Sequence, residues 1–517
     1  MNITTFGSIE APRGSGIADS SNSRPADWPW LCAILAVALV LRAINLNAGL
    51  WFDEIDTLVH YTRLPAAELL TVYPSLNHHV LFTLEAKAAI ALFGESAWAL
   101  RFPSLVFGVA SVWALWLVAR EVVSRQEALL SALMLAVSYH HVWFSQNARG
   151  YTGLLFWGLL ATYFLIRAAK TPSWRLWTAY GLVSALAIHT HLSAAFFVAA
   201  HGLIYCGVAA RRLMTATPAR DPASAAAEGL SGFLPLYGFV LAGGLALLLH
   251  APLIPQMIGT FAAVAGGQSP LDAAASAEWK SPGWMVAEVV RGLGPVLGIA
   301  LPVIVVVAGF GIADLRKNAP ILPALILIHI PLTLAVLVAV SMRVWPRYFF
   351  IDIGFICLFL VHGAYVIGRI AADRMGASGH WKVSGQRLGA ILAMAGIAAS
   401  LILLPRNYLY PKQDFVGARD FVEAQRAAKS EVVTLGLATM PYADYYAPQW
   451  REVESIDELV ALRQSGRQVW LVYAFPSVTE RRYKEIAGYV SRNFDRIARF
   501  PGTLGGGDVL VWRSVPQ

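Results

Sequence analysis

Long runs of apolar residues follow one another between residues 28 and 404, separated by more polar segments. As α-helices, most of these runs are long enough to cross a hydrocarbon core about 30 Å thick. The first run lacks a small-residue cleavage site, so we interpret it as an uncleaved anchor and not as a signal peptide. The pattern predicts eleven membrane-spanning helices, at about 28–46, 98–119, 127–144, 151–167, 174–190, 192–209, 232–251, 293–312, 320–341, 348–368 and 387–404.

The loops between these runs differ in charge. Basic residues gather in every second loop, which is the bias that cytoplasmic loops of membrane proteins show. They are Arg120 and Arg125, then Arg167, Lys170 and Arg175, then Arg211, Arg212 and Arg220, then Arg316 and Lys317, and finally Arg369, Arg374, Lys382 and Arg387. We therefore expect the N-terminus in the cytoplasm, and an odd number of spans then places the C-terminus outside.

The last part of the chain has a different pattern, in which short β-type runs alternate with helical periodicity. The predicted strands are 431–437, 468–474 and 508–512, and the predicted helices are 456–464 and 479–493. This alternation predicts a small extracytoplasmic α/β domain. The expected domains are a disordered cytoplasmic leader at 1–27, a membrane domain at 28–404 with outer loops at about 47–97 and 252–292, and the α/β domain at 405–517.

Composition agrees with a polytopic α-helical membrane protein. Hydrophobic residues make up 57% of the 517 residues and charged residues only 14%, against about 25% in soluble domains. The formal net charge of +8 could indicate nucleic-acid binding, but the basic residues follow the loop topology instead. Cys32, Cys206 and Cys357 all lie in apolar runs, which excludes a disulfide framework and a cysteine zinc site.

Two adjacent acidic residues, Asp53 and Glu54, follow the first predicted span and come directly after an aromatic pair. One interpretation is a solvated helix start, with Asp53 as the N-cap and Glu54 in the first turn. The other is a carboxylate held just above the bilayer, where it could take a proton from an incoming hydroxyl group. The spacing alone is compatible with both.

The same outer loop reaches a histidine pair, His78 and His79, before a short apolar helix at 80–93 that carries Glu85. This helix is too short and too polar for a span, so we expect it to be interfacial or re-entrant. Paired histidines beside acids could bind a divalent metal ion, donate to a phosphate, or simply lie at the membrane interface. The metal is the less favoured interpretation.

Arginine residues at outer helix ends run against the general charge bias. Arg149 lies between the third and fourth predicted spans, and Arg343 and Arg347 lie between the ninth and tenth. The Arg347 guanidinium beside Tyr348 suits a phosphate group at the membrane surface, whereas Arg343 is expected to anchor in lipid headgroups.

Two ionisable residues, Asp352 and His362, lie within the tenth predicted span. Ionisable side chains are costly inside a membrane, so each is treated as a candidate functional residue. Because Asp352 follows Tyr348 by one helical turn, we predict that it pairs with Arg347. The second outer loop is long enough to form a mobile segment over the site.

Four of these segments together are similar to one family. In order they are Leu50-Trp51-Phe52-Asp53-Glu54 after the first span, Arg101-Phe102-Pro103-Ser104 opening the second, Ala148-Arg149-Gly150-Tyr151 opening the fourth and Arg347-Tyr348 opening the tenth. Over roughly residues 28–370, the chain resembles the GT-C membrane glycosyltransferases, especially glycosyltransferase family 39 and the bacterial aminoarabinose transferases of lipid A.

This resemblance implies the fold, the reaction and the location. Members of the family take a sugar from a polyprenyl-phosphate lipid and attach it, outside the cytoplasmic membrane, to an acceptor. It implies a GT-C type protein of the bacterial inner membrane that acts on a lipid, glycan or protein acceptor, with no nucleic-acid partner. A single displacement implies inversion at the sugar. The reaction requires no cofactor, and a divalent metal ion is compatible with it.

The resemblance also implies roles for individual residues. Asp53 is similar to the family's catalytic carboxylate, with Glu54 as its partner. The implied donor-phosphate groups are Arg347, Tyr348, His78 and Arg149, and a metal ion or phosphate could also meet His79 and Glu85. The family usually has His-Pro-Pro or Lys-Pro-Pro where His78 stands, and here both prolines are absent.

Two other functions explain part of the pattern. A lipid or solute transporter would account for the spans, but transport sites lie nearer the bilayer midplane, where this sequence has few ionisable groups. A non-catalytic scaffold would use its outer domain to bind a partner. The aromatic residues of that domain could stack on a sugar, but are expected to pack in its core; they are Tyr442, Tyr445, Tyr446 and Trp450.

Overall fold

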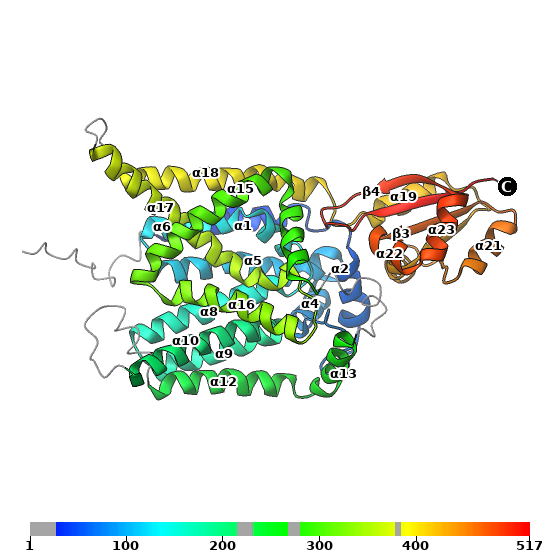
Figure 1. Cartoon of the computed structure of the whole chain (residues 1–517). Helices are drawn as coiled ribbons and strands as arrows, with labels where there is room; N and C mark the ends of the chain where they lie inside the picture. The colour runs from blue at the N-terminus through cyan, green and yellow to red at the C-terminus, as the bar shows by residue number, and fades with distance from the viewer. Residues whose placement is uncertain (1–26, 215–229, 231, 267–279, 378–383, 517) are drawn as a thin grey trace, which may run out of the picture.

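The computed structural model describes residues 27–214, 230, 232–266, 280–377 and 384–516. The predicted leader lies almost wholly outside the described residues, and so does the middle of the second outer loop, 267–279. The described chain is mostly helical, with a small sheet near its C-terminal end (Figure 1).

A helix covers each of the eleven apolar runs. These helices are α1 (Trp28–Ala43), α5 (Ala97–Arg120), α6 (Arg125–Ala136) with α7 (Tyr139–Ser145), α8 (Tyr151–Lys170), α9 (Trp174–Thr190), α10 (Ala194–Met214), α12 (Phe233–His250), α15 (Pro282–Asn318), α16 (Ile321–Ala339), the 3-10 helix η3 (Pro346–Asp352) with α17 (Ile353–Ala377), and α18 (Gly385–Leu409). Among the described residues, seven helices are long and apolar enough to cross a membrane, or eight if the bent pair α6–α7 counts as one span.

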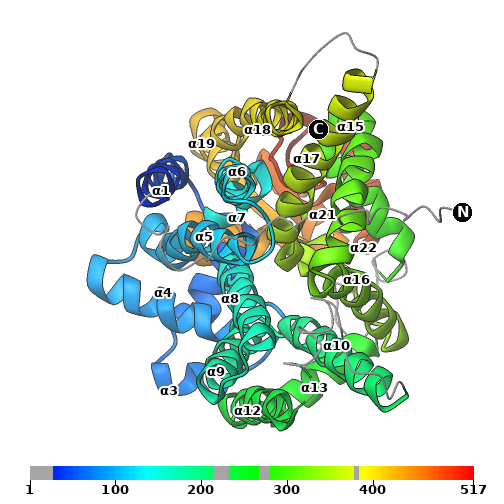
Figure 2. The ribbon, with the colours of Figure 1, turned by 90° about the vertical axis from the view of Figure 1, so that its left-hand side faces the viewer.

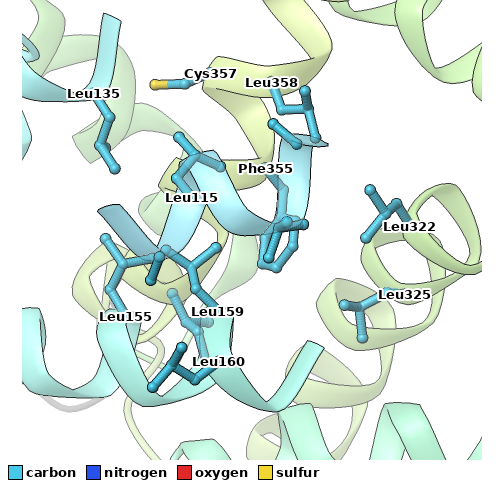
Figure 3. Close-up of a cluster of buried hydrophobic side chains, with 14 of the residues drawn as sticks. Leu115, Leu135, Leu155, Leu159, Leu160, Leu322, Leu325, Phe355, Cys357 and Leu358 are labelled. Atoms are coloured by element: carbon cyan, nitrogen blue, oxygen red, sulfur yellow. The ribbon is translucent and has the colours of Figure 1, made fainter. Parts of the chain in front are cut away.

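The helices form a bundle whose centre is apolar. The most apolar windows of α8 and of the η3–α17 segment are 72% and 78% buried, whereas those of α12 and α18 are only 28% and 22% buried. Figure 2, which looks along the bundle, shows α8 surrounded by other helices. Figure 3 shows Phe355 and leucines of α5, α6, α8, α16 and α17 that belong to this buried cluster. Large apolar side chains remain exposed on the outer helices, among them Leu248 and Ile402, so the periphery suits a hydrocarbon environment.

The third predicted span is not one straight helix, because α6 and α7 meet at an angle of 58°. The buried guanidinium of Arg42 lies at this bend, where it donates to the Ala136 carbonyl at 2.9 Å and to Ser145 Oγ at 3.1 Å. Carbonyl groups that a helix end leaves without partners are therefore satisfied from α1. The bend directs α7 and the segment after it toward the first outer loop.

That first outer loop contains four short helical segments. They are α2 (Phe52–Thr57), the π-helical turn η2 (Leu58–Thr62), α3 (Ala66–Leu69) and α4 (Val80–Phe93). In the second outer loop, α13 (Ile254–Ala265) is tied to the first loop, because Gln256 accepts a hydrogen bond from the Tyr73 backbone N–H at 2.7 Å and Thr260 donates to the Tyr73 carbonyl at 2.7 Å. Helices α2, α4 and α13 lie at the end of the bundle that faces the C-terminal sheet (Figure 1).

The C-terminal part is a five-stranded mixed sheet in the order β2-β1-β3-β5-β4. Strand β1 pairs in parallel with β2 and β3, and β5 pairs antiparallel with β3 and β4. Its elements are α19 (Phe415–Gln425), β1 (Glu431–Leu435), η4 (Gly436–Ala438), α20 (Thr439–Pro441), η5 (Tyr442–Tyr446), β2 (Arg451–Glu452), α21 (Ile456–Gln464), β3 (Val469–Ala474), α22 (Pro476–Arg482), α23 (Lys484–Asn493), β4 (Phe494–Phe500) and β5 (Val509–Ser514).

The structure confirms the three predicted strands and adds two. Strand β2 is only two residues long, and β4 is an edge strand with charged residues at several positions, so neither shows a hydrophobic run. The predicted helix at 479–493 is two helices, α22 and α23, which meet at Tyr483. Tyr442 and Trp450 are buried, as the core-packing interpretation predicts, whereas Tyr445 and Tyr446 are half-buried and pack against the same core.

Candidate active site

The acidic pair lies in the first turn of α2, which begins at Phe52. The N-cap position is Trp51, and its backbone N–H donates to the Glu54 carboxylate at 3.3 Å. The interpretation of Asp53 as the N-cap is therefore wrong. The capping carboxylate belongs to Glu54, three residues after the cap, so Asp53 is left to make other contacts.

Glu54 is completely buried and fully occupied by donors. Arg101 donates to its two oxygens from Nε at 2.7 Å and from Nη2 at 2.6 Å, and the Ala148 backbone N–H donates at 2.7 Å. Burial disfavours the charged carboxylate, but the Arg101 guanidinium outweighs it and holds the pKa of Glu54 below its ordinary value. Glu54 thus joins the α2 turn to α5 and to the segment before α8.

Asp53 faces a different partner. Its Oδ2 forms an ion pair at 3.0 Å with Nη1 of Arg347, which lies in η3 at the start of α17. The Arg347 guanidinium also lies over the Trp345 ring, 4.9 Å from its centroid. Among the described residues, Arg347 Nε is buried and has no hydrogen-bond partner.

The predicted pairing of Asp352 with Arg347 is wrong. Asp352 lies against His329 of α16, with its oxygens 3.0 and 3.1 Å from His329 Nδ1. The segment is a 3-10 helix with three residues per turn, so side chains five positions apart point about 120° away from each other. Because Asp352 pairs with His329, the Arg347 guanidinium can form its ion pair with Asp53. The other ionisable group of this segment, His362, lies between Glu127 and Asp314.

Arg149 is buried at the start of α8 and reaches the first outer loop. It donates from Nη1 to the Asn77 carbonyl at 2.7 Å and to Thr57 Oγ1 at 3.1 Å. Its Nη2 lies 3.0 Å from Nε2 of His79, whose Nδ1 accepts from the Gly150 backbone N–H at 2.9 Å. A neutral imidazole has only one acceptor nitrogen, so His79 accepts from one of these two donors at a time.

The two adjacent histidines are both held in the neutral form. Burial, aided by the charge of Arg149, lowers the pKa of His79 well below its ordinary value. Burial lowers the pKa of His78 to about 4. The His78 ring stacks on Tyr61 with centroids 4.4 Å apart, and its Nδ1 donates to the Val72 carbonyl at 3.1 Å. Its Nε2 therefore carries a lone pair.

Several of these groups border one cavity of about 160 Å³. Its polar lining residues are Tyr73, His78, His79, His191, Ser193 and Tyr348. The rest of its wall is mostly apolar and comes from α10, α13, α16 and the loops next to them, with Phe196, Phe261, Leu337, Val340 and Met342 among the lining residues. In the part of the chain that the structure describes, His78 Nε2 and Arg149 Nε are buried without a hydrogen-bond partner.

The structure therefore brings together seven of the eight predicted site residues but leaves Glu85 apart. Burial raises the pKa of the Glu85 carboxyl to about 8, and none of the contacts described above involves this residue. Within the described ranges, no group of three or more His, Cys, Asp or Glu side chains is placed to hold a metal ion.

Two residues at the site received no role from the sequence. His191 packs edge-on against His79 with ring centroids 4.5 Å apart, and Arg101 holds Glu54. Arg101 belongs to one of the four motifs, and His191 lies at an outer helix end. The location of each residue in the sequence was therefore a signal that could have identified it as part of the site. The contacts themselves join segments that are far apart in the sequence.

Comparisons with known proteins agree with this architecture. The family model for dolichyl-phosphate-mannose-protein mannosyltransferases matches residues 78–235, a segment that includes His78, His79 and Arg149. Among curated proteins, none matches the sequence. The apo structure of ArnT from Cupriavidus metallidurans is 14% identical, with a TM-score of 0.51 over 95% of this chain and 100% of that chain.

A second solved structure is the archaeal oligosaccharyltransferase AglB from Archaeoglobus fulgidus, in complex with an inhibitory peptide and a dolichol-phosphate. It is 10% identical, with a TM-score of 0.50 over 90% of this chain and 72% of that chain. The resemblance indicated by the motifs is thereby confirmed: the chain has the fold of the GT-C membrane glycosyltransferases, and its residues 78–235 match the mannosyltransferase family model.

Proposed function

We propose that this protein is an integral membrane glycosyltransferase. It moves a sugar from a polyprenyl-phosphate donor to a hydroxyl or phosphate group of a lipid, glycan or protein acceptor on the outer side of the bacterial cytoplasmic membrane. One observation carries the proposal: a carboxylate, Asp53, is paired with Arg347, whose neighbour Tyr348 lines an apolar cavity, and buried nitrogens of Arg347, Arg149 and His78 lack partners among the described residues.

The two unpaired arginine nitrogens suit the donor phosphate. Arg347 and Arg149 each offer an Nε–H to phosphate oxygens, and charge-assisted hydrogen bonds of this kind are strong where water is excluded. Tyr348 adds a hydroxyl at the wall of the cavity. The neutral His78 Nε2 is an acceptor, so in this proposal it meets a sugar hydroxyl and not a phosphate oxygen. The apolar wall suits the first part of a prenyl chain, and the AglB structure contains a lipid phosphate of this class.

Asp53 is the proposed general base. It takes the proton of the acceptor hydroxyl while the hydroxyl oxygen forms a bond to the anomeric carbon. The bond from that carbon to the phosphate oxygen breaks, and polyprenyl phosphate leaves with the electron pair, so the sugar is inverted. In this proposal the donor phosphate competes with Asp53 for the Arg347 guanidinium.

Glu54 has a different role in this proposal. The sequence resemblance implies a catalytic partner of Asp53, but all its contacts are structural: Arg101, Trp51 and Ala148 occupy its oxygens. We therefore assign it to positioning the α2 turn. The scheme routes no step through a metal ion, and a metal at His79 or Glu85 stays a prediction.

The membrane topology belongs to the same proposal. Eleven spans, a cytoplasmic N-terminus and the 405–517 domain outside would place α2, α4 and the site at the outer membrane surface, where a lipid-linked phosphate lies. The charge of the loops supports this orientation.

The test is release of free polyprenyl phosphate by the purified protein in lipid vesicles. The donors are a panel of polyprenyl-phosphate sugars and the acceptor is a crude membrane extract. Wild type is expected to release polyprenyl phosphate with one sugar, and Asp53→Asn to lose at least about a hundredfold in rate. Equal release by both proteins would remove Asp53 from its role. Movement of the labelled donor across the vesicle membrane without release would support the transporter instead.

A further inference from the structure

Two contacts from outside the helical bundle converge on Phe52, the residue before Asp53. Gln413 Oε1 accepts a hydrogen bond from the Phe52 backbone N–H at 3.1 Å. The ring of Phe475 packs edge-on against the Phe52 ring, with centroids 6.0 Å apart. Gln413 follows α18 and Phe475 follows β3, so both contacts come from the C-terminal domain.

The Phe52 N–H is one of the groups that a helix start leaves without an internal partner. The N-cap residue Trp51 satisfies none of them with its side chain, and Glu54 is turned toward the N–H groups of Trp51 and Ala148. The C-terminal domain thus supplies, from more than 350 positions away in the chain, the acceptor for the first N–H of α2.

Gln413 is itself firmly held. Its side chain is buried, and its Nε2 donates to the Gly507 carbonyl at 3.0 Å, so a donor and an acceptor fix the orientation of the amide. The next residue back, Lys412, donates to the Gln146 carbonyl at 2.5 Å. The loop between β4 and β5 packs closely against the segment that contains Lys412 and Gln413. A Cβ atom on Gly502 of this loop would collide with the Lys412 carbonyl.

Phe475 shows an independent sign of constraint. It is a non-glycine residue in the left-handed region, with φ 52° and ψ 63°. Such conformations persist only where the surroundings enforce them, and they cluster at functional sites. Here the strained residue is the one whose ring meets Phe52.

We propose that the C-terminal domain positions the general base, with Gln413 as a positioning residue that fixes Phe52. Asp53 then stands between two anchored neighbours: Phe52, held by the C-terminal domain, and Glu54, held by Arg101 of the bundle. This inference rests on the proposed function, because it concerns the geometry of the proposed base.

The test compares three variants of the full-length protein in the polyprenyl-phosphate release assay. Gln413→Leu removes both hydrogen bonds, and Gln413→Glu keeps an acceptor for the Phe52 N–H. The control, Ser514→Ala, removes a buried hydrogen bond to the Val469 N–H inside the same domain but away from Phe52. We expect Gln413→Leu to lower kcat by about ten- to a hundredfold with little change in the donor KM, Gln413→Glu to recover part of that loss, and Ser514→Ala to keep the wild-type kcat.

Three results would overturn the inference: an unchanged kcat in Gln413→Leu, an equal loss in Gln413→Leu and Gln413→Glu, or an equal loss in Ser514→Ala. If Gln413→Leu does not fold, Phe475→Gly serves instead, because glycine accepts the left-handed backbone while the ring contact is lost. It is expected to fold and to lose kcat, and an unchanged kcat overturns the inference. Wild-type activity distinguishes the two levels: an inactive wild type contradicts the proposed function, whereas an active wild type with a fully active Gln413→Leu contradicts only this inference.

Discussion

At the scale of single residues, the two adjacent acidic residues differ in how deeply they are buried, and this difference gives them different roles. Glu54 is completely buried with Arg101, whereas Asp53 and Arg347 keep 13% and 28% of their side chains exposed. Glu54→Gln leaves the Arg101 charge buried without its counter-charge, so we expect the free energy of unfolding to fall by about 3–5 kcal/mol. Thermal unfolding in detergent measures this. Asp53→Asn is the matched control and should unfold near the wild-type temperature; equal losses would contradict the division of roles.

The buried histidines predict how stability responds to acid. The pKa of His78 falls to about 4 in the folded protein, below its ordinary 6.5. Between these values the unfolded chain binds a proton that the folded chain does not, so stability falls as the pH drops from about 6.5 to about 4. We expect His78→Asn to lose less stability than wild type over this window, as measured by unfolding temperatures at several pH values.

His60 provides the control for that experiment. Its hydrogen bond to Asp56 raises its pKa, so its contribution is fully present at acid pH and is lost as the pH rises through the folded pKa. Over the window from about pH 6.5 to about 4, His60→Asn should therefore lower stability by a constant amount and leave the slope as in wild type. A slope for His78→Asn as steep as that of wild type would contradict the assignment of a neutral His78.

At the scale of elements, close helix packing depends on particular glycines. A Cβ at Gly311 of α15 would collide with the Phe359 carbonyl of α17, whereas a Cβ at Gly309 of the same helix meets nothing within 4 Å. We expect Gly311→Ala to lower the free energy of unfolding by about 1–3 kcal/mol, because the two backbones must separate. Gly309→Ala should leave stability unchanged or slightly higher. Equal effects on the unfolding temperature would show that α15 and α17 do not pack in this way.

The helices around the site also show how much of the structure a sequence pattern can predict. The apolar runs predicted helices at all eleven positions, because burial in a hydrocarbon or helical interior requires such runs. Periodicity did not predict the bend between α6 and α7, since Arg42, which satisfies the carbonyls there, comes from another helix. In the same way, the 3-10 form of η3 changed the partner of Asp352.

At the scale of the whole molecule, the topology can be tested by labelling from outside. The proposed orientation places Lys484 of the C-terminal domain outside and Lys317, at the end of α15, in the cytoplasm. Both side chains are exposed. In intact cells, a membrane-impermeant maleimide should label Lys484→Cys and leave Lys317→Cys at the level of wild type. The reverse pattern would overturn the orientation. Permeabilised cells, in which both should react, are the control.

The sequence by itself determined the class of the protein, its helical runs, three of the five C-terminal strands and most residues of the candidate site. These depend on local properties: apolar length, charge in loops, and motifs at helix ends. The tertiary structure decided which residues meet. It assigned Asp53 to Arg347, Glu54 to Arg101 and Phe52 to Gln413. No periodicity encodes these contacts, because each joins segments whose proximity arises only when the helices pack and the C-terminal domain docks on them.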